Sequence, residues 1–96
     1  MKYSNIVKFK TKEGQFDNVM NLLSEPMNVN GLNQHIIVKT GENLLCAIGI
    51  WESEDHIVNA RPEMIKRLDS IRDMLDTLSE ELGVTDPVSG PILHEH

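Results

Sequence analysis

The chain has 96 residues, the size of one small domain, so we expect a single domain over residues 1–96. Its formal net charge is −6, and only 4% of its residues are aromatic. Nucleic-acid binding needs a basic surface, usually with exposed aromatic side chains, so this composition excludes it. The single cysteine, Cys46, precludes an intrachain disulfide, and no signal peptide or membrane-length apolar segment is visible. We therefore expect a cytoplasmic protein with no membrane partner.

The first half of the chain predicts a strand, a helix and a hairpin. Residues 2–10 mix β-branched and aromatic residues with polar ones, which is typical of a strand. Apolar residues at helical spacing then predict a helix over residues 13–25, which Pro26 ends. Residues 31–40 and 44–51 follow as two strands of a hairpin, joined by a tight turn.

The second half predicts a longer helical region and a final strand. Ser53 is a suitable helix cap, and Pro62 is expected to start a second helical segment at its first turn. An apolar stripe from Met64 to Leu82 continues that segment until Gly83 ends it. The stripe is shorter than three heptads, so we favour a helix lying on a sheet over a coiled-coil seam. Residues 86–95 predict a short strand, which its prolines restrict to a sheet edge.

This order of elements, βαββαβ, predicts an α+β fold of the ferredoxin-like type. We expect a four-stranded antiparallel sheet with both helices on one face. The first and third strands should be central, and we expect them to be parallel to one another. The second and fourth strands should be edges.

The third strand is apolar on both faces, although the helices can cover only one. Leu44, Cys46, Ile48 and Ile50 alternate with Leu45, Ala47, Gly49 and Trp51. A monomer would leave the second face as a large apolar patch in solvent, which monomers seldom tolerate. The pattern therefore predicts a homodimer in which a second copy covers that face.

The hairpin loop decides which side chains share a face. A three-residue loop, Gly41-Glu42-Asn43, with Asn43 in the left-handed conformation, segregates the faces well. A two-residue loop would move Asn33 and His35 to the opposite face. With three residues, an aliphatic face comprises Ile36, Val38, Leu44, Cys46, Ile48 and Ile50, and we expect the helices to cover it. The other face comprises Asn33, His35, Ile37, Leu45, Ala47, Gly49 and Trp51, the composition of a ligand cavity. Tyr3 and Asn5 are left unassigned.

Three stretches carry a resemblance to a known family. The segments "NIVKFKTKEGQFD", "IGIWESEDH" and "GVTDPVSGPILHE" resemble small bacterial proteins of the antibiotic-biosynthesis monooxygenase-like family, within the dimeric α+β barrel superfamily. The resemblance spans nearly the whole chain. It implies a homodimer with a cavity between each sheet and its helices or at the dimer seam. Some relatives oxidise aromatic polyketides or quinols with O₂ and neither metal nor flavin, others degrade haem, and many have no assigned activity.

Two departures from the family pattern limit what the resemblance implies. Haem-degrading relatives carry a tryptophan and a histidine about ten residues apart on the second helical region, whereas Trp51 is the only tryptophan and ends a strand. Asn5 matches their strand asparagine, but we reject haem degradation. Many oxygenase-like relatives carry a histidine eight to ten residues after the strand-end tryptophan, where this chain has Asn59-Ala60-Arg61. No cofactor or metal is expected.

The candidate site residues lie on the predicted cavity wall. His35 is the candidate catalytic base that would remove a phenolic proton, and Asn33 is the candidate that would stabilise an anionic intermediate. Trp51, Ala47, Gly49 and Ile37 are the candidate ligand-binding residues, although Trp51 also suits a plain core position. Arg61 could bind an anion or simply be solvated, and Cys46 suits a buried apolar position.

Two classes of function stay open. One is a cofactor-independent monooxygenase acting on a small aromatic or quinol-like substrate. The other is a non-catalytic dimeric module that binds a small ligand or has a regulatory role. His94 and His96 have metal-ligand spacing, but they lie in a terminal tail without an obvious third ligand, so no metal site is predicted.

Overall fold

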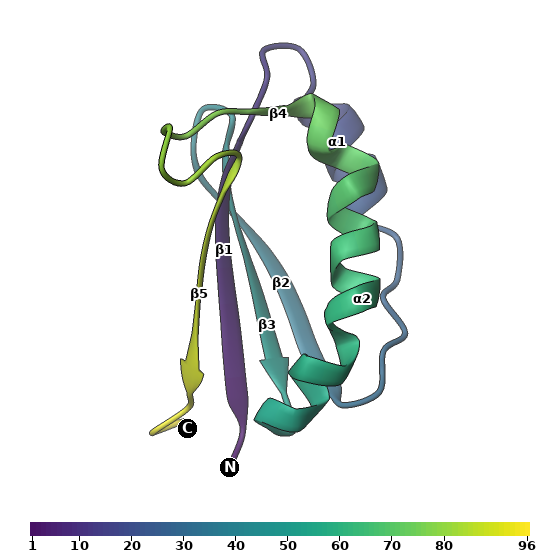
Figure 1. The fold of residues 1–96 in the computed structure, drawn as a ribbon, viewed down its shortest axis with the longest axis vertical. Helices are drawn as coiled ribbons and strands as arrows, with labels where there is room; N and C mark the ends of the chain where they lie inside the picture. Colours follow the sequence, from purple (N-terminus) through teal and green to yellow (C-terminus); the bar gives the residue numbers. More distant parts are fainter.

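A computed structural model describes all 96 residues and confirms the α+β, ferredoxin-like fold. The elements are β1 (Tyr3–Thr11), α1 (Phe16–Leu23), β2 (Leu32–Gly41), β3 (Leu44–Trp51), α2 (Glu54–Ile71) and β5 (Thr85–Pro91). A 3₁₀ turn (Arg72–Met74) and a two-residue strand, β4 (Leu75–Asp76), connect α2 to β5. Both helices lie on one side of the sheet, and the two termini lie at the same end of the molecule (Figure 1).

The sheet has β2 at one edge, then β3, then β1, with β5 and β4 sharing the far side of β1. Every pairing is antiparallel, including that of β1 with β3. The expectation that these two central strands are parallel is therefore wrong. The crossover through α1 makes β1 and β2 parallel, and the hairpin then reverses β3. The proline-containing β5 does lie at an edge, as predicted.

The β2–β3 hairpin closes through two residues, Glu42 and Asn43, and not through the predicted three, because Gly41 pairs with Leu44, but its long-range register is the predicted one. Asn43 has a φ of 61°, the left-handed conformation that asparagine tolerates. A bulge between Lys39 and Gly41 absorbs the extra residue of the loop, so that Val38 pairs with Cys46 and His35 pairs with Gly49. The two predicted groups of β2 and β3 side chains are thus segregated as expected, apart from Asn33.

The helices cover the opposite face from the one we predicted. Their main core contains Phe9, Leu45, Ile71, Leu75, Val19 and Leu23, with Ile37 and Ala47 packed against it. A second cluster joins Trp51 to Ile57 and Ala60 of α2. The face that carries His35 and Trp51 is therefore the covered one. The aliphatic face of Ile36, Val38 and Leu44 is open, and these three side chains are 37%, 40% and 38% exposed.

The first strand explains this choice of face. Lys8 and Lys10 pair with Cys46 and Leu44, so they share the open face, where their ammonium groups stay in water. Phe9 pairs with Leu45 on the covered face, where it is 4% exposed. Covering the lysine face with helices would bury two unpaired charges, which costs far more than exposing aliphatic side chains.

The second helix is a single helix rather than two segments. Ser53 caps it as predicted, because its side-chain oxygen accepts from the His56 backbone N–H at 3.3 Å. Pro62 lies inside it and not at the start of a new segment. The carbonyl left without a partner is that of Val58, a residue 48% exposed, where solvent can replace the missing bond. No helix of the protein has both the length and the apolar character needed to span a membrane.

The predicted continuation of this helix to Leu82 is also wrong, since α2 ends at Ile71. Leu75 is only 2% exposed because β4 carries it into the core, where it pairs with Thr11. The Met74 carbonyl accepts from the Lys12 backbone N–H at 2.9 Å. Tertiary pairing therefore overrides the helical spacing of the apolar residues beyond Ile71.

Candidate functional site

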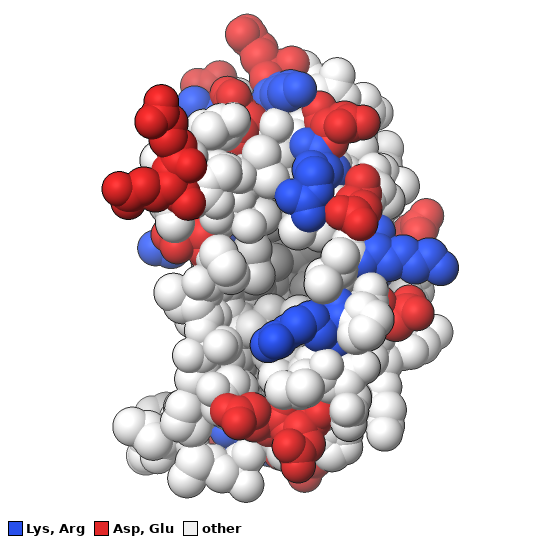
Figure 2. Space-filling model, viewed as in Figure 1, with Lys and Arg blue, Asp and Glu red and all other residues white.

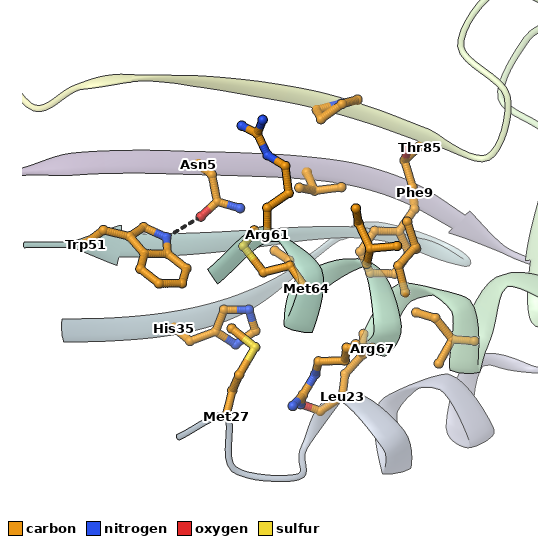
Figure 3. Close-up of a pocket in the computed structure, with 16 residues that line it drawn as sticks. Asn5, Phe9, Leu23, Met27, His35, Trp51, Arg61, Met64, Arg67 and Thr85 are labelled. Atoms are coloured by element: carbon orange, nitrogen blue, oxygen red, sulfur yellow. Dashed lines mark hydrogen bonds between the residues drawn. The ribbon is translucent and has the colours of Figure 1, made fainter. Parts of the chain in front are cut away.

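A cavity of about 340 Å³ lies between the covered face of the sheet and α2. Sixteen residues line it, ten of them hydrophobic, which gives an apolar site with a few polar groups. The strands contribute Asn5, Val7, Phe9, His35, Ala47, Trp51, Thr85 and Pro87. The helices and the segment after α1 contribute Leu23, Met27, Arg61, Met64, Ile65, Arg67, Leu68 and Ile71 (Figure 3).

One end of the cavity is fixed by a hydrogen bond between two strands. The Trp51 indole Nε1–H donates to Asn5 Oδ1 at 2.7 Å, and Trp51 is fully buried. Gly49 provides the space for this bond, because a Cβ there would lie 2.3 Å from Asn5 Oδ1 and 2.8 Å from Trp51 Nε1. The acceptor of Asn5 is thereby occupied, while its amide nitrogen points into the cavity (Figure 3).

His35 is the only histidine on the cavity wall. Burial lowers the pKa of His35, and the Arg67 cation lowers it further, because both disfavour the charged ring. The imidazole is therefore neutral at physiological pH, with one ring nitrogen free to accept a proton. A neutral imidazole beside an apolar cavity has the protonation state that a general base requires.

Two arginines of α2 line the cavity, and neither forms an ion pair. Arg67 Nη2 donates to the backbone carbonyls of Leu23 and Glu25, each at 2.6 Å, and so holds the C-terminal end of α1. Arg67 Nε is buried and has no hydrogen-bond partner. Arg61 is exposed at the cavity edge and extends toward β1 and β5 (Figure 3).

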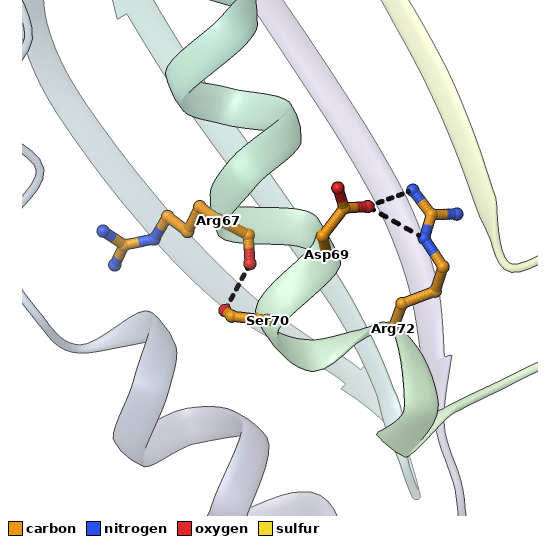
Figure 4. Close-up of polar contacts among 4 residues, drawn as sticks. All are labelled: Arg67, Asp69, Ser70 and Arg72. Atoms are coloured by element: carbon orange, nitrogen blue, oxygen red, sulfur yellow. Dashed lines mark hydrogen bonds and ion pairs between the residues drawn. The ribbon is translucent and has the colours of Figure 1, made fainter.

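The remaining arginine of the chain, Arg72, is placed differently. Its Nε and Nη2 atoms contact Asp69 Oδ1 at 3.2 and 3.1 Å on the outside of the helix end. The Arg67 side chain points away from this pair, toward α1, while its backbone carbonyl accepts from Ser70 (Figure 4). The charge of Arg72 is thus balanced locally, whereas those of Arg61 and Arg67 are not.

Two of the four candidate ligand-binding residues line this cavity, and two do not. Trp51 and Ala47 line it together with the candidate base His35. Gly49 lies beneath the bond between Asn5 and Trp51 and does not itself face the cavity. Ile37 lines a neighbouring hollow near the end of α1.

Asn33 lies away from the cavity. It is exposed, and its side-chain amide donates to Glu52 Oε2 at 3.1 Å. The pairing register shifts between Leu32 and Gln34, so Asn33 does not follow the regular alternation of β2 and does not share the face of His35. The structure therefore gives Asn33 no access to a ligand bound beside His35.

Four polar residues of the cavity wall are not assigned to the site by the sequence pattern: Asn5, Arg61, Arg67 and Thr85. The pattern assigns Asn5 to neither face, leaves Arg61 open between anion binding and solvation, and does not indicate Arg67 or Thr85. The alternation of Val7 and Phe9 with Lys8 carried a signal for Asn5, because it places Asn5 with Phe9 on the buried face. The position of Arg67, in the turn of helix that follows Pro62, carried no comparable signal.

No group of three or more histidine, cysteine or acidic side chains gathers to form a metal site. His94 and His96 contact one another through Nε2 and Nδ1 at 3.2 Å, and both are exposed in the C-terminal tail.

Comparison with solved structures identifies the fold. A protein provisionally named an antibiotic biosynthesis monooxygenase, from Chloroflexus aurantiacus J-10-fl, matches with a TM-score of 0.75 at 14% identity, over 100% of this chain and 97% of its own. SnoaB, a cofactor-independent oxygenase from Streptomyces nogalater, matches in a mutant form with a TM-score of 0.68 at 13% identity, over 98% and 95% of the two chains.

A protein of unknown function from Nitrosomonas europaea matches equally well, with a TM-score of 0.78 at 14% identity, over 99% of this chain and 92% of its own. No family profile and no curated protein matches the sequence. The chain thus has the ferredoxin-like fold of antibiotic biosynthesis monooxygenase-like proteins, the fold that the sequence resemblance implied.

Proposed function

We propose that the protein is a cofactor-independent monooxygenase that oxidises a small aromatic or quinol-like substrate in the cavity between its sheet and α2. The observation that carries the proposal is His35, a neutral imidazole with a lowered pKa on the wall of an apolar cavity of about 340 Å³. A shared fold alone is weak evidence for an activity, so the proposal depends mainly on the position and protonation state of His35.

The proposed reaction begins with a proton transfer to His35. Loss of a phenolic proton makes the aromatic ring electron-rich, so that an activated methylene carbon of the substrate can react with O₂. One oxygen atom stays on that carbon as a carbonyl oxygen, and the other leaves as water with the two methylene hydrogens. The amide of Asn5 would donate to the phenolate oxygen as charge develops there. The apolar lining would exclude water from the intermediate.

The experiment measures oxygen uptake in the presence of anthrone-type phenols, which carry the activated methylene that the reaction oxidises. We expect wild-type protein to exceed the buffer rate and His35→Ala to fall to it. His94→Ala removes a histidine from the exposed tail and should behave as wild type. Equal rates for wild type and His35→Ala, or a wild-type rate no faster than buffer, would contradict the proposal.

A non-catalytic ligand-binding module is the second candidate, and one observation favours it. His35, Arg61 and Arg67 are the only ionisable side chains on the cavity wall, and an arginine does not release its proton near neutral pH. No second acid or base would therefore assist the departure of water. Ligand-dependent change of Trp51 fluorescence without oxygen uptake would support this candidate over the enzyme.

We also propose that two copies pack through the open faces of their sheets. Eight aliphatic or thiol side chains share that face: Ile6, Ile36, Val38, Leu44, Cys46, Ile48, Ile50 and Val88. Of these, Val88 is 55% exposed in the single chain. A contiguous apolar face of this extent typically marks an interface, and the fold supplies no helix to cover it. A second copy presents the same face and would cover its aliphatic part symmetrically, with the ammonium groups of Lys8 and Lys10, which share the face, left in water at the rim of the contact.

A further inference from the structure

The charged side chains of the cavity wall are all of one sign. Two of the three arginines of the chain line it, together with the amide nitrogen of Asn5, and none of the fifteen acidic residues does. This is the reverse of the composition of the chain, whose net charge is −6. Figure 2 shows a hollow near the middle of one face, with basic side chains beside it, while acidic side chains lie toward both ends and along one side of the face.

These donors lack internal partners that would neutralise them. The ion pairs of the protein are Lys2 with Glu95 and Arg72 with Asp69, both outside the cavity. The Arg61 side chain makes no hydrogen bond within the chain, and Arg67 Nε is buried without a partner. An unpaired cation beside a low-dielectric cavity attracts an anion more strongly than the same cation in open solvent.

We infer that the cavity selects an apolar molecule that carries one carboxylate, with Arg61 binding the carboxylate at the cavity edge. This inference rests on the proposed function, because it names the class of ligand for the same cavity. The planar fork of arginine matches a carboxylate, and the ten hydrophobic lining residues accept the apolar body. Arg67 adds positive potential from within α2, but its Nη2 atom is held by the end of α1.

Arg61 is the residue to test, because its side chain is exposed and makes no hydrogen bond that holds the fold together. The probes are 4-butylbenzoate and its neutral isostere 4-butylbenzamide, measured by calorimetry at pH 8 and by the fluorescence of Trp51, the single tryptophan. We expect wild type to bind the benzoate about ten-fold more tightly than the benzamide, the size of a charge-assisted hydrogen bond. Arg61→Gln should reduce this ratio to about one while leaving benzamide affinity unchanged.

Arg72→Gln is the matched control, since it removes the same charge outside the cavity, and its ratio should equal that of wild type. An equal ratio in Arg61→Gln and wild type, no preference in wild type, or no binding of either probe would overturn the inference. Neither probe contains an oxidisable methylene activated by a phenol. If the protein prefers the benzoate but consumes no oxygen with any phenol, the proposed reaction is wrong and the inferred carboxylate selectivity still holds.

Discussion

Asn5 and Trp51 connect the two central strands of the sheet from inside the cavity. The Asn5 side-chain oxygen accepts from the indole nitrogen at 2.7 Å, and the strands place Asn5 directly opposite Gly49. The bond does two things at once. It satisfies the polar atom of a fully buried tryptophan, and it turns the amide nitrogen of Asn5 toward the ligand space.

Gly49→Ala should disrupt this connection. The new Cβ would approach Asn5 Oδ1 and Trp51 Nε1 more closely than van der Waals contact permits, so one side chain must move. We expect a loss of about 1–3 kcal/mol in the free energy of unfolding, measured by urea titration. Gly90→Ala is the control, because nothing lies within 4 Å of its Cβ position and its stability should be unchanged. Equal stabilities of the two variants would contradict this account of Gly49.

Arg67→Met should separate the end of α1 from α2. The arginine satisfies the Leu23 and Glu25 carbonyls, which α1 leaves free at its C-terminal end. Losing hydrogen bonds from a charged donor costs about 2 kcal/mol, and methionine keeps most of the apolar packing. Arg72→Met, which breaks only an exposed ion pair, should cost less than about 1 kcal/mol in the same urea titration. A larger loss for Arg72→Met than for Arg67→Met would show that the arginine does not hold α1.

His35 should make the stability of the protein dependent on pH. Burial and Arg67 hold the pKa of His35 below its ordinary value of 6.5, so the unfolded chain binds a proton at a higher pH than the folded one. The unfolded state then holds more protons in the window below pH 6.5, and stability falls as pH falls through that window. Above it the imidazole is neutral in both states, and the contribution is fully present.

The measurement for His35 is the urea midpoint of wild type and His35→Gln between pH 8 and pH 5. We expect the midpoint of wild type to fall more steeply below pH 6.5, because glutamine does not titrate. The other three histidines are common to both proteins, so the difference isolates His35. Parallel pH profiles would contradict the assigned pKa direction.

Much of the fold was predictable because local signals agreed with one another. The alternation of β3, the left-handed Asn43 and the helix cap at Ser53 each follow from nearby residues, and the structure has all three. The choice of covered face was not predictable from β2 and β3, since both of their faces are apolar. Only Lys8 and Lys10 on β1 distinguish the two faces of the sheet. They can be placed on one face only when the pairing of β1 with β3 is known.

The candidate site shows the same limit. His35 was found because it shares a face with Trp51 in the correct register, and two residues away the alternation fails at Asn33. Arg67 lies in the cavity through the packing of α2 on the sheet, which depends on where that helix ends. The predicted helix extended beyond Ile71, so the sequence offered no reliable position for Arg67.

The last prediction concerns the open face of the sheet. Val38→Glu places a charge among the exposed aliphatic side chains of β2 and β3, where a second copy would have to bury it without a partner. Burying an unpaired carboxylate costs several kcal/mol, which is enough to dissociate a dimer at micromolar concentration. We expect light scattering to give wild type twice the chain mass of 10.9 kDa and Val38→Glu a mass near 10.9 kDa.

Val58→Glu is the control for this experiment. Val58 is 48% exposed on α2, on the side of the molecule away from the open face, so its replacement should leave the mass of wild type unchanged. A wild-type mass near 10.9 kDa would show that the aliphatic face is solvated in a monomer. If both variants dissociated, the contact between copies would involve the helices, and the sheet-to-sheet packing would be the wrong arrangement.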